Sequence, residues 1–139
     1  MQSQEKDSLI VARIFPNENV FEQLKIVCSK HSIKAGIVLS GIGQLGSVEL
    51  GFFKEKGNYA NQKFGAPLEV LGISGIISKK ENDFDFHLHI SLSDEQKNAF
   101  GGHFISGVVS VTLELVVLKT EIKITRQTEE ETGLAGLFL

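Results

Sequence analysis

An unbroken alternation of apolar and polar residues runs from Asp83 to Leu92 and limits how this part of the chain can fold. Every second side chain is apolar: Phe84, Phe86, Leu88, Ile90 and Leu92. A period of two is that of a β-strand with one buried face, whereas an amphipathic helix repeats every three to four residues. The opposite face carries Asp85, His87, His89 and Ser91. Both histidines are therefore expected to point away from the core.

A third histidine, His103, follows Gly101-Gly102 at the start of the next apolar stretch. If residues 93–101 connect two antiparallel strands, a register that places His89 opposite His103 brings the three imidazoles together. Directly opposed Cβ atoms lie about 4.5–5.5 Å apart, and residues two apart on a strand about 6.6–6.8 Å. Three nitrogens at about 2.0–2.1 Å around zinc leave a fourth position for water, substrate or a group from another subunit. A register shifted by one residue would send His103 to the other face.

Two interpretations of these histidines remain open. In the first, His87, His89 and His103 bind a divalent transition metal, with zinc as the first choice, although nickel, copper and iron also accept imidazole. In the second, His87 and His89 are solvated or interface residues that bond to nearby carbonyls, and His103 is a turn residue.

Composition restricts the class of protein. A chain of 139 residues with 42% hydrophobic and 22% charged residues fits a single domain, 1–139. A net charge of −3 argues against a nucleic-acid surface. A lone cysteine, Cys28, excludes an intramolecular disulfide and fits a reducing compartment. No stretch has the length of a membrane span or the pattern of a secretory signal, so a cytoplasmic location is expected.

The first half of the chain predicts two strands around a helix. Residues 9–15 favour a strand, residues 20–31 an amphipathic helix capped by Asn17 or Asn19, and residues 35–40 a second strand. Cys28 is expected to pack in the core; as a nucleophile it would need activation by His31. The glycines of 41–46 spell the dinucleotide fingerprint G-x-G-x-x-G, but the residues after them alternate like a strand. Without a following helix no nucleotide site is expected.

The second half predicts further strands. We expect a polar segment around 57–61, a strand at 68–77, a charged turn at 78–82 and a strand at 121–126. Residues 104–118 are apolar on both faces and should form a central strand. Glu114 stands out there, because a buried carboxylate is costly unless it is paired, for example with Arg13. Residues 1–8 are expected to be flexible, and the apolar tail 127–139 to dock on the domain or on a neighbouring subunit.

The order of these motifs resembles one family, the PPC (plants and prokaryotes conserved) domain. The resemblance rests on the segments 35–46, 68–75, 87–94 and 101–114, and on Thr125-Arg126 and Glu131-Thr132-Gly133. It implies an α+β fold: a single compact domain in which a curved, mainly antiparallel sheet carries a packed helix, assembled as a homotrimer. Family members in plants follow AT-hook segments that bind DNA, but this chain has no Arg-Gly-Arg-Pro hook. The histidines matching His87, His89 and His103 look like a metal-site pattern.

Three functions are compatible with the sequence. The first and favoured one is a homotrimeric binding or assembly protein whose metal fixes a pocket for a small-molecule ligand. The second is a metal-dependent enzyme acting on a small molecule, with Glu114 or Glu49 as a candidate base. The third is a DNA-associated regulatory protein, which the acidic charge and the absent hook argue against.

Overall fold

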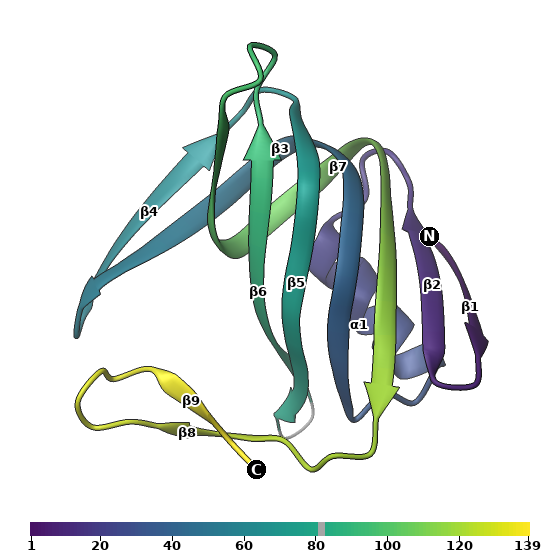
Figure 1. Ribbon diagram of the computed structural model, residues 1–139, viewed down its shortest axis with the longest axis vertical. Helices are drawn as coiled ribbons and strands as arrows, with labels where there is room; N and C mark the ends of the chain where they lie inside the picture. The colour runs from purple at the N-terminus through teal and green to yellow at the C-terminus, as the bar shows by residue number, and fades with distance from the viewer. Residues whose placement is uncertain (81–82) are drawn as a thin grey trace.

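The computed structural model describes residues 1–80 and 83–139 and consists mainly of antiparallel strands, with one short helix (Figure 1). The elements in chain order are β1 Gln2–Lys6, β2 Leu9–Ile14, α1 Val20–Lys30, β3 Ala35–Glu55, β4 Asn58–Phe64, β5 Leu68–Lys80, β6 Asp83–Ser93, β7 Ala99–Thr120, β8 Thr125–Thr128 and β9 Ala135–Phe138. The long strands β3 and β7 each pair with several neighbours, and this organises the whole sheet.

Strand pairing closes the sheet on itself. The sheet order is β1-β2-β7-β6-β5-β3-β4, and β7 pairs in addition with β3. The first part of β7 lies against β6 and its later part against β2, while β3 follows it along most of its length. Pairings therefore run in a ring through β7, β6, β5 and β3, which gives the strong curvature visible in Figure 1. The short β8–β9 hairpin forms a separate two-stranded sheet.

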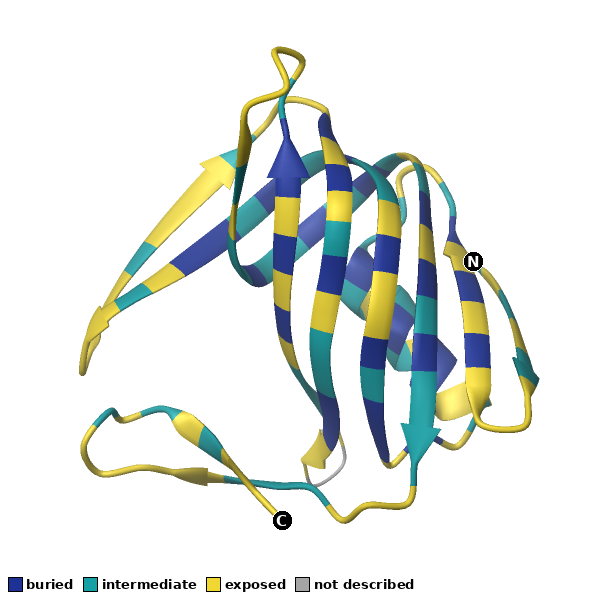
Figure 2. Cartoon of the chain, in the orientation of Figure 1, coloured by how far each residue is buried: buried dark blue, intermediate teal, exposed yellow. Residues whose placement is uncertain are grey.

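The helix α1 covers one face of this sheet. Asn19 caps it, because its side-chain oxygen accepts hydrogen bonds from the backbone N–H groups of Phe21 and Glu22. The ring of Phe21 contacts Phe86 of β6 and Phe104 of β7, at centroid distances of 5.7 and 5.0 Å. The apolar side chains of β6 thus face the helix, and the alternating buried and exposed bands of Figure 2 follow from this. The histidines of β6 lie on the opposite face.

Several expectations are confirmed. The helix and its cap are present. The strand β7 is central in the sheet: β3 pairs with one of its edges, and the other edge pairs first with β6 and then with β2. One boundary differs: the strand predicted over 35–40 does not end at the glycines but continues through the G-x-G-x-x-G segment as part of β3. Gly43 adopts φ +147°, and a Cβ there would lie 2.0 Å from the carbonyl oxygen of Thr112. This glycine permits a close approach of β3 and β7 and does not form a nucleotide-binding turn.

Other expectations differ from the structure. Residues 121–126 were expected to form one strand, but the regular strand β8 begins only at Thr125, after irregular backbone. Residues 58–61, to which the sequence assigned no strand, belong to the polar strand β4. The strand β5 extends to Lys80, and the rest of the predicted 78–82 turn, residues 81–82, lies outside the described residues. Within residues 1–8, expected to be flexible, β1 pairs with β2.

Candidate metal centre

Three histidines of two neighbouring strands converge on one point. His89 of β6 lies opposite His103 of β7, which is the register expected from the sequence. The three ring centroids of His87, His89 and His103 form a nearly equilateral triangle with sides of 5.4, 5.4 and 5.5 Å. One nitrogen of each ring lies within 4.8 Å of a nitrogen of the others. Tetrahedral zinc needs ligand nitrogens roughly 3.3–3.4 Å apart, so small side-chain rotations suffice to close the group on an ion.

The chemistry of the group fits a metal ion. The Nδ1 atom of His103 is buried and has no hydrogen-bond partner among the described residues. A buried polar atom without a partner carries a free-energy cost, which a metal or a ligand can remove. Imidazole nitrogen is also a common ligand of zinc and of other first-row transition metals. The three residues could therefore hold such an ion.

The backbone around β6 fixes the positions of these side chains. Gly75 of β5 lies next to the site-bearing strand with φ +150°, and a Cβ on it would lie 2.0 Å from the carbonyl oxygen of His87. The β6–β7 connection is closed by Asp94, whose carboxylate accepts hydrogen bonds from the backbone N–H and the side-chain amide of Asn98. Lys97 supplies the positive φ, 70°, that the turn requires. This connection sets the register that aligns His89 with His103.

The environment favours neutral imidazoles. Partial burial lowers the pKa of His87, and the charges of Arg126 and His89 lower it further, against an opposing effect of Asp85. Burial also lowers the pKa of His103, with His87 and His89 contributing in the same direction. Metals bind the neutral imidazole. The electrostatics thus favour the protonation state that a metal requires.

A pocket of about 230 Å³ opens beside the histidines. Its lining comes from β4, β6, β7 and the C-terminal hairpin: Tyr59, Asp85, Phe86, His87, His103, Arg126, Leu134 and Ala135. The edge of the Tyr59 ring approaches His103 at a centroid distance of 6.3 Å. The β8–β9 hairpin therefore contributes one wall of the pocket. Lys56, in the turn between β3 and β4, donates a hydrogen bond to the carbonyl oxygen of Glu130 in the loop between β8 and β9.

The two glutamates considered as bases lie elsewhere. Within the described residues, neither Glu49 nor Glu114 belongs to the histidine group or lines its pocket. Glu49 of β3 lies 3.7 Å from the ammonium of Lys63. Glu114 is exposed, because its part of β7 is buried on one face only. Arg13 lies opposite it in register, but the Arg13 Nε donates to Thr112.

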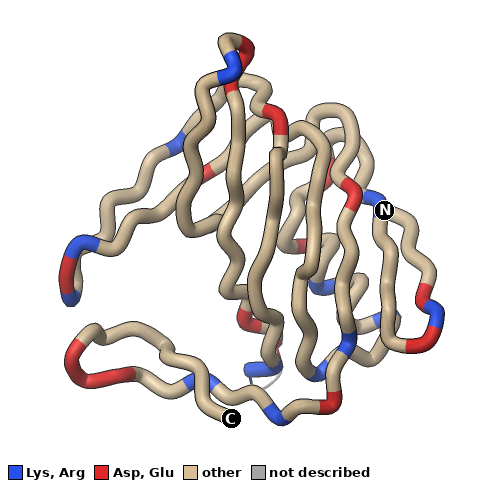
Figure 3. The backbone as a smooth tube through the Cα atoms, in the orientation of Figure 1, with Lys and Arg blue, Asp and Glu red and all other residues tan. Residues whose placement is uncertain are grey.

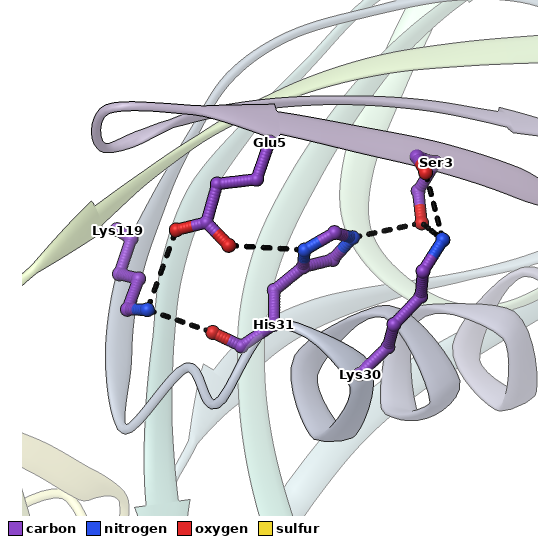
Figure 4. Close-up of polar contacts among 5 residues, drawn as sticks. All are labelled: Ser3, Glu5, Lys30, His31 and Lys119. Carbon is purple, nitrogen blue, oxygen red and sulfur yellow. Dashed lines mark hydrogen bonds and ion pairs between the residues drawn. The ribbon is translucent and has the colours of Figure 1, made fainter.

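The fourth histidine has a different role. His31 follows α1, and its two ring nitrogens lie 2.9 Å from the hydroxyl of Ser3 and 3.0 Å from the carboxylate of Glu5 (Figure 4). The ammonium of Lys119 bridges Glu5 and the carbonyl oxygen of His31. This network connects β1 to α1. Both ring nitrogens of His31 are engaged in it, so neither is free to activate Cys28. Burial raises the pKa of the Cys28 thiol to about 12, and the residue packs in the core as expected.

Three residues of the pocket were missed in the sequence. Asp85 was assigned only to the polar face of its strand, Tyr59 to a polar segment and Arg126 to the end of a strand. Asp85 could have been found, because it stands two residues before His87 on the same face. Tyr59 and Arg126 reach the histidines only through tertiary packing, and no local pattern signals that contact.

Comparison with known proteins identifies the family. The chain matches the Plants and Prokaryotes Conserved (PCC) domain over residues 1–121 and belongs to this family. A candidate DNA-binding protein from Bacteroides thetaiotaomicron has the same fold, with 25% identity, a TM-score of 0.91 and coverage of 99% of this chain and 96% of that one. A metal-containing protein from Archaeoglobus fulgidus is 24% identical with a TM-score of 0.85, over 97% and 96% of the two chains.

Two curated relatives carry a similar segment within much longer chains. The bifunctional protein GlmU from two Synechococcus strains is 27% identical over 129 residues, which is 91% of this chain. The chain spans about a fifth of the length of these relatives.

Surface charge and hydropathy complete the description. Lys and Arg residues are interspersed with Asp and Glu and do not gather in one basic stripe over the part of the chain shown (Figure 3). Among the described residues, no helix is long and apolar enough to cross a membrane.

Proposed function

We propose that the chain is a homotrimeric binding or assembly module that holds a zinc ion through His87, His89 and His103. The observation that carries the proposal is the convergence of three imidazole nitrogens within 4.8 Å, one ring having a buried Nδ1 without a partner. Bound zinc would supply a Lewis acid with one position free for an oxygen ligand. The pocket beside the histidines would admit a small molecule to that position.

The exposed sheet face supports assembly. Residues paired across neighbouring strands project to the same face, and a row runs from His87 through Ile76, Ile37 and Leu118 to Leu9. Val11 and Ile42 on this face are half exposed, at 53% and 54%. A contiguous exposed apolar face is typical of an interface between subunits. The candidate metal centre lies on the same side of the sheet.

Metal analysis of untagged protein tests the zinc site. Wild-type protein, reconstituted with zinc and dialysed, is expected to retain close to one ion per chain by mass spectrometry. His103→Ala should lose most of it, because two imidazoles bind far more weakly than three. His31→Gln removes the one histidine outside the group and should retain zinc. Zinc-free wild type, or equal retention by His103→Ala, would overturn the assignment.

A metal-dependent enzyme is the second candidate, and one observation favours it. Asp85 places a carboxylate in the same pocket as two of the three histidines, where a general base for a metal-bound group would be needed. Turnover by the zinc-loaded protein that is lost in Asp85→Asn, with zinc retained, would favour catalysis. Binding without turnover would favour the module.

A further inference from the structure

The C-terminal hairpin places a cation beside the candidate metal centre. Arg126 of β8 lines the pocket together with His87 and His103. Its Nη1 donates a hydrogen bond to the carbonyl oxygen of Ala135 in β9, at 3.3 Å, which holds the guanidinium against the hairpin. Its Nε and Nη2 atoms are both buried and have no hydrogen-bond partner within the part of the chain that the structure describes.

The two unpaired nitrogens lie on one edge of the guanidinium group. Nε and Nη2 project their N–H bonds in parallel, which is the geometry that binds both oxygens of a carboxylate. Leaving the buried donors of a charged group without partners costs several times more free energy than leaving neutral donors without partners. A native structure keeps such a pair mainly where a ligand or a partner completes it.

The charges of the pocket are consistent with an anionic ligand once a metal is present. Arg126 contributes one positive charge and Asp85 one negative charge, and a zinc ion on the histidines would add two positive charges. The remaining lining includes the aromatic Tyr59 and the aliphatic Leu134 and Ala135. The pocket, of about 230 Å³, is partly open to solvent and has room for a small organic molecule.

From this arrangement we infer that the pocket binds a small organic carboxylate, whose carboxylate group would pair with the Nε–Nη2 edge of Arg126 beside the metal that His87, His89 and His103 would hold. This inference rests on the proposed metal-binding function and names the ligand class of that site. Arg126 is then a specificity-determining residue, supplied by a hairpin outside the main sheet.

Isothermal titration of zinc-loaded protein with lactate tests the inference. Lactate carries a carboxylate and a neighbouring hydroxyl; its amide, lactamide, has nearly the same shape without the charge. Lactate is expected to bind, and lactamide and inorganic phosphate to bind at least about tenfold more weakly, because hydrogen bonds between charged groups contribute about 1.5–3 kcal/mol. The zinc content is measured after each titration, so that removal of the ion by the ligand is detected.

Substitutions separate the role of Arg126 from a general effect of charge. Arg126→Gln should weaken lactate binding about tenfold or more while zinc is retained. Arg126→Lys should recover only part of the lost affinity, because lysine cannot form a bidentate contact with a carboxylate. Arg13→Gln removes the only other arginine of the chain and should bind lactate like the wild type.

Four results would overturn the inference. Zinc-loaded wild type that gives no lactate binding, or Arg126→Gln that binds lactate as tightly as wild type, rules out the carboxylate site while the metal site stands. Failure of wild type to retain zinc removes the proposed function and this inference with it. Loss of the oligomer in Arg126→Gln, without lactate binding by the wild type, would mean that a neighbouring subunit pairs with the guanidinium.

Discussion

At the scale of single residues, the candidate site depends on close backbone contacts as much as on its histidines. Gly75 is the clearest case, because its positive φ and the contact with the carbonyl oxygen of His87 both exclude a side chain. The strand that carries two of the three histidines can lie where it does only because β5 has no Cβ at this point.

We therefore expect Gly75→Ala to destabilise the fold by about 3 kcal/mol or more, through backbone strain and displacement of β6. Gly72→Ala is the matched control in the same strand, since a Cβ there meets nothing within 4 Å. Urea unfolding of both variants measures the difference. A Gly75→Ala protein as stable as Gly72→Ala would show that β5 and β6 can move apart without cost.

At the scale of elements, the network around His31 connects the first strand to the helix. Partial burial would raise the pKa of Glu5, but the hydrogen bonds and charges of Lys119 and His31 outweigh it and lower the pKa below its ordinary value of 4.5. A carboxylate with a lowered pKa stabilises the folded state above its unfolded pKa, and that contribution is lost as the pH falls through the folded pKa. The attachment of β1 should therefore weaken in acid.

Glu5→Gln tests this linkage. The wild type should be more stable than the variant at neutral pH, and the difference should shrink as the pH falls below 4.5 and vanish in stronger acid. Glu121→Gln, at an exposed position just after β7, should behave like the wild type across the same range. Urea unfolding at successive pH values provides the measurement. A difference between wild type and Glu5→Gln that stays constant with pH would contradict the ionic role of Glu5.

Elements with a local pattern could be predicted from the sequence, and those formed by distant contacts could not. The alternation of 83–92 predicted β6, and Asn19 with the apolar stripe after it predicted α1, because both signals lie within one element. The strand β4 is polar and pairs only with β3, so it carries no apolar alternation. The histidine triad could be found because two members share a strand, whereas Arg126 joins the pocket through the folding back of the C-terminal hairpin.

At the scale of the whole molecule, the exposed face of the sheet brings assembly and the candidate site onto one surface. The register places Ile42 of β3, Glu114 of β7 and Arg13 of β2 in one row across this face. The opposite side of the same strands is buried against the core, as at Leu113 and Leu115. The apolar side chains left exposed on this face, among them Ile42, Val11 and Leu9, are expected to be covered by another copy of the chain.

Ile42→Asp should convert the proposed trimer to monomers, because burying an unpaired carboxylate in the interface costs more than the lost apolar contact. The monomer itself should remain folded, since Ile42 is 54% exposed within one chain. Light scattering coupled to size exclusion gives the oligomeric state, and circular dichroism reports the fold. Ile122→Asp introduces the same change at a residue 57% exposed, outside the strands of the main sheet, and should leave the trimer intact. A wild type that is monomeric at micromolar concentration, or an Ile42→Asp protein that stays trimeric, would place the interface elsewhere or remove it.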